Sequence, residues 1–123
     1  MPTGPTYHVR ISAGKVACDA ALQPNATARA IWNALPIQGS ANRWGEEIYF
    51  EIPVDLAEEG DARQDVAVGD LAYWPPGSAL CIFWGQTPAS TGDAPRAASP
   101  VNVFGHIDKG ATAFAAVTSG TPV

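Results

Sequence analysis

The sequence predicts a mainly β protein, a small closed antiparallel barrel with one or two short capping helices. Short segments that alternate between apolar and polar residues recur between turn-forming residues, and one Ala-rich segment has helical spacing. Apolar runs on both sides of Pro75-Pro76-Gly77 indicate two strands joined by a tight connection. About seven short strands and one helix favour a barrel over a sandwich. With 123 residues the chain has the size of one domain, residues 1–123.

The N-terminal part predicts a β-hairpin followed by a helix. Residues 7–12 and 15–22 alternate in polarity on either side of a glycine-containing turn. Asn25 is a suitable cap for a helix over residues 26–35, where apolar side chains recur at helical spacing, and Pro36 ends that helix. Because the helix is short and apolar on one side, we expect it to cover an open end or a flank of the sheet.

Residues 37–44 and 47–53 predict a second hairpin. In its second arm the apolar side chains occupy alternate positions from Ile48 to Ile52. Side chains that alternate along a strand point to opposite faces of the sheet. We therefore expect one face of this arm to lie in the core and the other, which carries Glu47, to face solvent.

The second half of the chain combines two loops, a strand and a helical turn. Residues 54–68 are polar and acidic and predict a surface loop. Residues 86–100 are rich in Pro, Ala, Ser, Thr and Gly and predict a second long loop, which often forms a binding rim. Residues 101–107 predict a strand with a bulge at Gly105, and residues 112–117 predict one helical turn.

The charge balance narrows the classes of partner. Twelve acidic residues against seven basic ones give a net charge of −5, which disfavours a nucleic acid or an anionic membrane as partner. Nine of the acids fall between positions 46 and 70, most simply as a solvated loop rather than a divalent-cation site. Met1 is followed by neither a basic start nor an apolar core, so we expect no signal peptide, no transmembrane segment and a cytoplasmic protein.

The cysteines and histidines indicate no metal site and no cofactor. Cys18 and Cys81 lie far apart in apolar segments, which predicts two buried reduced thiols. The apolar neighbours of Cys81 raise the pKa of a thiol, which disfavours a catalytic nucleophile. His8 and His106 have no carboxylate or histidine at metal-ligand spacing. We expect both histidines to face solvent or a rim of the barrel.

Three segments, residues 42–53, 69–88 and 100–107, together resemble the atypical cyclophilin-like family of small bacterial and archaeal proteins. The resemblance is most specific in Trp-Gly-Glu-Glu-Ile-Tyr-Phe and in Gly-Asp-Leu-Ala-Tyr-Trp-Pro-Pro-Gly-Ser-Ala-Leu-Cys-Ile-Phe. It implies the cyclophilin fold, an eight-stranded barrel with helical caps. For that family no activity is established. Residues 119–123 resemble the start of a last strand that would close such a barrel.

Val103-Phe104-Gly105 also resembles a strand of the true cyclophilins, which are peptidyl-prolyl isomerases. True cyclophilins carry a Phe-His-Arg catalytic strand and a following Gly-Gly-Asp, and this chain has Asn42-Arg43-Trp44 in the comparable region. Only Arg43 carries over, as the guanidinium that would hold the substrate carbonyl in a divergent isomerase.

Arg43, Trp44, Glu46 and Glu47 form the densest polar and aromatic group beside a predicted turn. The simpler interpretation is an Arg–Glu ion pair stacked on Trp44 at the surface. The functional interpretation is a pocket wall in which Arg43 binds a carbonyl or carboxylate and Trp44 forms an apolar floor. Glu46 and Glu47 point to opposite faces of a regular strand, so they do not form an acid/base pair.

Adjacent aromatic residues in the central run point in opposite directions, so one ring of Tyr73-Trp74 and one of Phe83-Trp84 should be exposed, with Phe83 in the core. An exposed indole beside prolines often marks a ligand surface. The residues expected near an aromatic ligand-binding groove are Arg43, Trp44, Tyr49, Tyr73 and Trp74.

Three functions are compatible with these observations. The first is binding of a small molecule or peptide in the aromatic groove without isomerase activity. The second is a divergent peptidyl-prolyl isomerase with Arg43 as its catalytic group. The third is an interaction module in which exposed aromatic residues and a free sheet edge bind a partner or a second copy of the chain.

Overall fold

The computed structural model describes residues 7–123. Residues 1–6, on which the expectation of no signal peptide rests, lie outside the described residues. The strands are β1 (His8–Ala13), β2 (Val16–Leu22), β3 (Asn42–Arg43), β4 (Glu47–Glu51), β5 (Arg63–Asp65), β6 (Asp70–Trp74), β7 (Ala79–Phe83) and β8 (Arg96–Ile107). The helical elements are α1 (Ala26–Ala34), η1 (Pro75–Gly77) and η2 (Ala111–Ala116), of which η1 and η2 are 3₁₀ turns.

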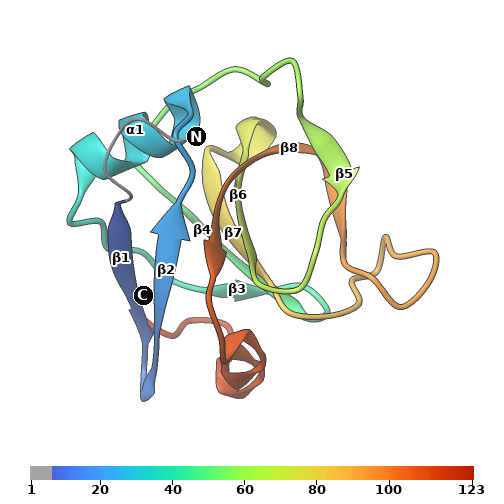
Figure 1. The fold of residues 1–123 in the computed structure, drawn as a ribbon. Coiled ribbons are helices and arrows are strands. Elements are labelled where there is room, and N and C mark those ends of the chain that lie inside the picture. Colours follow the sequence, from blue (N-terminus) through green and yellow to red (C-terminus); the bar gives the residue numbers. More distant parts are fainter. Residues whose placement is uncertain (1–6) are drawn as a thin grey trace.

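The strands form one antiparallel sheet in the order β1-β2-β8-β6-β7-β4-β3, with β5 paired to β8 (Figure 1). The sheet curls through 242° and stays open, so the structure is a half-barrel and corrects the expected closed barrel. Its edges, β1 and β3, do not pair with each other. The last residues bond to the β3 side only, where the Gly39 amide donates to the Val123 carbonyl at 3.0 Å. The expected last strand is therefore reduced to one bridge, between Ser40 and Pro122.

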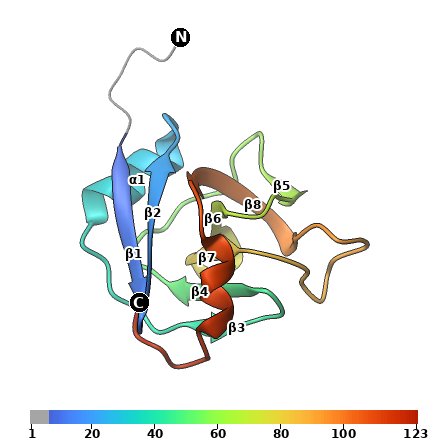
Figure 2. The same cartoon turned by 60° about the horizontal axis from the view of Figure 1, so that its bottom comes forward.

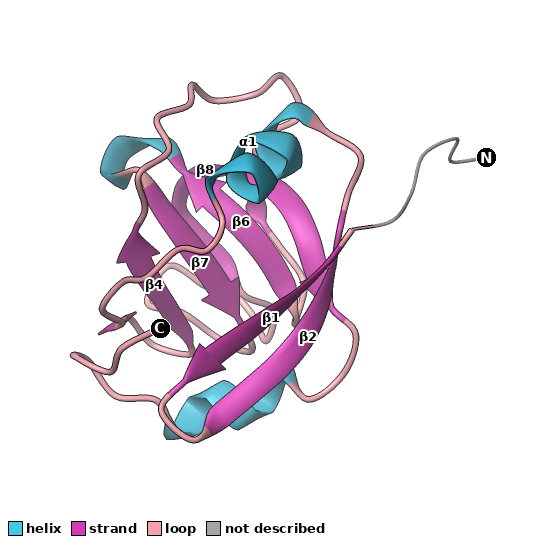
Figure 3. Ribbon diagram, turned by 90° about the vertical axis from the view of Figure 1, so that its left-hand side faces the viewer, coloured by secondary structure: helices cyan, strands magenta, loops and turns pink. Residues whose placement is uncertain are grey.

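The helix predicted after the first hairpin is confirmed as α1. The Asn25 side chain accepts a hydrogen bond from the Ala28 amide at 2.9 Å and donates one to the Val103 carbonyl at 3.1 Å. The same side chain therefore caps the helix and ties it to β8. Ile31 packs into the core, whereas Trp32 is exposed. The view of Figure 3 shows α1 and η2 at opposite ends of the half-barrel, as short capping helices should lie.

Both faces of the central sheet carry buried side chains. On the inner face the alternation predicted for β4 is confirmed, because Ile48 and Ile52 lie in the main hydrophobic core. On the outer face a second, smaller core forms around Cys81, Phe83 and Val101. Glu47 points to this outer face and is only 4% exposed. The expectation that this face of β4 is open to solvent is thus wrong for Glu47, which a covering segment buries, whereas Glu51 at the other end of the strand is exposed as expected.

The covering segment is the first half of β8. This strand begins at Arg96, within the stretch expected to be loop, and arches over the outer face to meet β5 (Figures 1 and 2). Its bend follows a bulge, since Leu71 pairs with Gly105 whereas the next residue, Ala72, pairs with Val103. The predicted bulge beside Gly105 is therefore confirmed. The extra residue turns β8 so that its two halves cover different faces.

Candidate functional site

A small pocket lies between the outer face of the sheet and the arch of β8. Its volume is about 150 Å³. The strand register explains which side chains line the pocket. Cys81 on β7 pairs with Tyr49 of β4 on one side and with Ala72 of β6 on the other. Residues paired in this way project to the same face of a sheet. The pocket is lined by Trp44, Glu47, Tyr49, Trp74, Cys81, Ala97, Ala98 and Val101.

Two aromatic side chains form a corner of the pocket. The rings of Tyr49 on β4 and Trp74 on β6 lie 6.3 Å apart between centroids, with 66° between their planes. The Trp74 indole nitrogen donates a hydrogen bond to the Ser99 hydroxyl of β8 at 2.7 Å. That bond fixes the orientation of the indole and joins the arch to the sheet.

The third aromatic side chain, Trp44, comes from the turn between β3 and β4. The Trp44 amide donates to the Glu47 carbonyl at 2.9 Å, which closes the turn. Gly45 in this turn has a φ of +62°, and a side chain there would also meet Pro88. Glycine is therefore needed at position 45 to place Trp44 at the pocket.

Glu47 is the buried acid of the pocket. One carboxyl oxygen, Oε1, has no hydrogen-bond partner. Burial raises the pKa of Glu47 to about 8, and an interaction with the Cys81 thiol lowers it by a smaller amount. A carboxyl in this state is mainly neutral at pH 7 and offers both a donor and an acceptor.

Cys81 lies next to this carboxyl and is 3% exposed. Burial, followed by the nearby Glu47, raises the pKa of the thiol well above its ordinary value. The thiol is therefore protonated at neutral pH and a poor nucleophile. Both Cys18 and Cys81 are free and buried, which confirms the prediction of two reduced thiols.

Arg43 points away from the pocket, which differs from its expected place in the groove. Its Nε donates to the Gly45 carbonyl at 2.6 Å, and its Nη1 donates to the carbonyls of Ala115 and Val117 at 2.9 and 3.0 Å. The guanidinium carbon lies 4.9 Å above the centre of the Trp84 ring. The side chain therefore stacks on Trp84 rather than on Trp44, and it anchors η2.

Tyr73 also lies outside the pocket, in the main core. Its hydroxyl donates to the Val54 carbonyl at 2.7 Å and accepts from the Leu56 amide at 3.1 Å, which holds the acidic loop against the sheet. Phe83 is buried, as expected, but so is Trp84. The expectation of one exposed ring in that pair is wrong because Trp84 packs on Phe114 of η2.

Of the five residues expected at the groove, the structure brings together Trp44, Tyr49 and Trp74 at one pocket. Glu47 and Cys81 were not among the five residues expected at the groove. The sequence placed Glu47 in the polar group beside Trp44 but on a solvent-facing side of its strand, since its burial depends on the arch of β8. The alanines at positions 97 and 98 carry no chemical signal in the sequence. The sequence placed them in a loop expected to form a rim.

The histidines lie away from this pocket. His106 is exposed and pairs with the Asp70 carboxyl at 3.1 Å, and His8 is also exposed. Within residues 7–123 no group of three or more His, Cys, Asp or Glu side chains is placed to hold a metal ion.

None of the helices in residues 7–123 has both the length and the apolar character needed to cross a membrane.

Comparison with known proteins agrees with this architecture. The model of the cyclophilin-like family matches residues 7–123. The chain belongs to the cyclophilin-like family. The solution structure of a hypothetical protein from Archaeoglobus fulgidus is similar, with 38% sequence identity and a TM-score of 0.80, over 96% of this chain and 92% of that one. The comparison with curated proteins found no match.

Proposed function

We propose that this cyclophilin-like domain binds a small molecule or a peptide side chain in the pocket formed by Trp44, Tyr49 and Trp74, without isomerase activity. The observation that carries the proposal is the Glu47 carboxyl, buried in the pocket with one oxygen unpartnered. An unpaired buried polar group costs about 1 to 3 kcal/mol, a cost that a ligand hydrogen bond would offset. A few polar groups within an aromatic pocket are typical of ligand sites.

The size of the pocket limits the ligand. Its volume of about 150 Å³ is well below the range of sites for drug-sized ligands, roughly 300 to 1,000 Å³. A single ring or one side chain fits this space, and a larger molecule would have to place its remainder along the arch of β8. The class of ligand is therefore a small ring compound or a peptide that inserts one residue.

The test uses two alanines of the same region. Ala98 lines the pocket, whereas Ala94 lies in the preceding loop, and both are exposed. Fragments and short peptides are titrated into labelled protein while the indole NH resonances are followed by NMR. We expect shifts for Trp44 and Trp74 that disappear in Ala98→Phe and remain in Ala94→Phe. Shifts that persist in Ala98→Phe, or no shifts with any compound, would overturn the proposal.

The isomerase alternative requires Arg43 to point into an apolar pocket. The guanidinium instead donates to three backbone carbonyls, so it is not free to hold a substrate carbonyl. We therefore expect no catalysed exchange of a short Xaa-Pro peptide in exchange NMR. Catalysis by the wild type that is lost in Arg43→Ala, with the fold intact, would favour the isomerase.

One observation favours the interaction module as a second candidate. The outer edge of β1 has no strand partner among residues 7–123, and an apolar cleft of about 720 Å³ opens beside it. Unpaired backbone groups at a sheet edge can pair with another strand. A mass that rises with protein concentration in sedimentation equilibrium would support this function, and a constant monomer mass would oppose association with a second copy.

A further inference from the structure

The aromatic walls of the pocket favour one class of ligand. The faces of Trp and Tyr rings carry negative electrostatic potential and attract cations within about 6 Å of the ring centre. Tyr49 and Trp74 meet at 66°, so their rings present two differently oriented walls to a bound group, and Trp44 adds a third side chain. Three such rings around a small space are typical of sites for ammonium groups.

The polar lining of the pocket also favours a cationic ligand. Glu47 supplies a carboxyl, 4% exposed, whose Oε1 has no partner. The lining contains no basic side chain. Buried carboxylates in proteins are usually paired with a positive charge. Here the lining supplies the acid and the rings, and a ligand would supply the cation.

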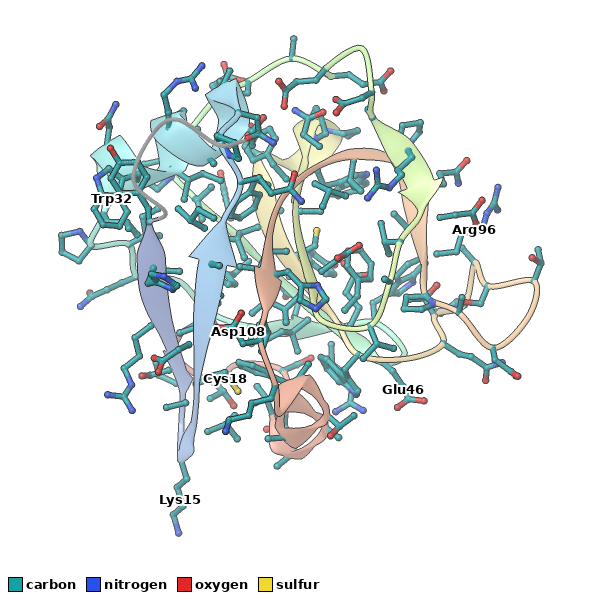
Figure 4. The ribbon with its side chains drawn as sticks, viewed as in Figure 1. Lys15, Cys18, Trp32, Glu46, Arg96 and Asp108 are labelled. Atoms are coloured by element: carbon teal, nitrogen blue, oxygen red, sulfur yellow. The ribbon has the colours of Figure 1, made fainter. Side chains whose placement is uncertain are left out.

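The basic side chains of the surrounding elements lie outside the lining of the pocket. Arg43 donates to backbone carbonyls near η2. Arg96 of β8 pairs with Asp65 at 3.4 Å. Figure 4 shows Arg96 at the periphery of the molecule, and Glu46 at a separate peripheral position. The other titratable side chains of the lining are those of Tyr49 and Cys81, and neither can carry a positive charge. Arg63 of β5 pairs with Val101 of the lining, but it is exposed and does not line the pocket. Among residues 7–123, no arginine or lysine therefore lines the pocket beside Glu47.

The charge distribution of the molecule also favours a cationic ligand. His106 is held by Asp70, at the far end of β6 from Trp74. The chain as a whole carries a net charge of −5. A negative molecule attracts cations and repels anions at long range.

We propose that the pocket binds a methylated or quaternary ammonium group, with the Glu47 carboxylate as its counter-ion and the rings of Trp44, Tyr49 and Trp74 around it. This inference rests on the proposed function, since it names the ligand class of the same pocket. It requires no covalent chemistry.

Binding of such a cation is coupled to the ionisation of Glu47. Burial raises the pKa of Glu47 to about 8 in the free protein, so at lower pH the carboxyl must release its proton when the cation binds. The affinity for a permanent cation should therefore rise about tenfold per pH unit up to about pH 8 and level off above it. A neutral ligand of the same shape should show no such rise.

The test compares choline with dimethylbutanol, its neutral isostere in which carbon replaces nitrogen. Both are titrated by calorimetry at about pH 6.5 and pH 9, on either side of the Glu47 pKa. We expect choline to bind at least tenfold more tightly at the higher pH, and the isostere to bind weakly at both. Glu47→Gln should remove the pH dependence and most of the choline affinity. Glu46→Gln, which changes the adjacent exposed acid, should alter neither.

The outcomes distinguish a failure of the cation inference from a failure of the proposed binding function. If the isostere binds as tightly as choline, or if choline binding does not change with pH, the cation inference is overturned while the binding pocket stands. The same holds if choline does not bind but other fragments shift the indole resonances. If no compound of any class shifts them, the proposed function fails as well.

Discussion

At the scale of single residues, the two acids that are buried within residues 7–123 differ in their partners. Asp70 is 7% exposed and accepts one hydrogen bond from the Ala67 amide, with His106 beside its other oxygen. Glu47 is 4% exposed and has one unpartnered oxygen. Burial without a compensating charge favours the protonated form of a carboxyl. Burial therefore raises the pKa of Glu47, and the ionisation of this side chain is linked to folding.

We predict that the stability of the protein falls with pH because of Glu47. Its pKa in the folded state, about 8, lies above the ordinary value of 4.5, so the folded protein retains a proton that the unfolded chain releases. The contribution is complete below the unfolded pKa and is lost as pH rises through the folded one. Relative to Glu47→Gln, the free energy of unfolding should decline by about 1.4 kcal/mol per pH unit between about pH 5 and pH 8.

Urea denaturation of both proteins across this pH range measures the difference. Glu46→Gln serves as the control, because its carboxyl is exposed. Parallel stability profiles for the wild type and Glu47→Gln would show that Glu47 ionises normally in the folded protein.

At the scale of elements, β8 decides the shape of the molecule. Its first half pairs with β5 and covers the outer face, and its second half pairs with β2. The bulge before Gly105 separates these two parts. A side chain at position 105 would lie 2.8 Å from the Ala21 carbonyl oxygen of β2 and 3.1 Å from Leu22. The close approach of β8 to β2 therefore depends on glycine at this position.

We predict that Gly105→Ala destabilises the protein by about 1 to 3 kcal/mol, because the added methyl group must displace the backbone of β2 or β8. Gly60→Ala is the matched control, since a side chain at position 60 would meet no atom within 4 Å. Thermal unfolding should show a lower midpoint for Gly105→Ala and a nearly unchanged one for Gly60→Ala. Equal midpoints for the two variants would show that a methyl group at position 105 does not clash with β2.

At the scale of the whole molecule, the open half-barrel is held by contacts between distant parts of the chain. The Arg43 guanidinium joins β3 to the carbonyls of Ala115 in η2 and of Val117, which follows η2, more than seventy positions later in the sequence. The Arg43 amide also donates to the Ser119 hydroxyl at 2.9 Å. These bonds fix the C-terminal segment beside β3, and with it Trp84 and Phe114.

We predict that Arg43→Ala lowers the free energy of unfolding by about 2 kcal/mol, because charge-assisted hydrogen bonds are lost and carbonyls are left without a donor. Arg43→Lys should lose less, since it keeps the charge but not the planar geometry. Urea denaturation measures both. Ligand binding at the Trp44 pocket should persist in each folded variant. An Arg43→Ala protein with unchanged stability and no binding would place the guanidinium in the site after all.

The sequence alone determined the local elements, because their signals are local. Alternation located β1, β2 and β4, and Asn25 with Pro36 located α1. The Gly105 bulge was also visible, since glycine tolerates the crowding of a bent strand. Three of the pocket residues were found in the same way, from aromatic side chains beside turns.

Only the tertiary structure decided which face of each strand is covered and whether the barrel closes. Nothing in the composition of residues 96–100 indicates a strand, because this part of β8 forms by pairing with β5, which has only 3 residues. The arch of β8 then covers Glu47 on the outer face of β4, which turns this residue from an expected surface acid into part of the lining of a pocket. Likewise, the hydrogen bonds from Arg43 to η2 join segments that are distant in sequence. The position of β1 at the edge of the sheet also follows from the pairing of the whole set of strands. Burial and pairing are properties of the assembled chain, so no local pattern encodes them.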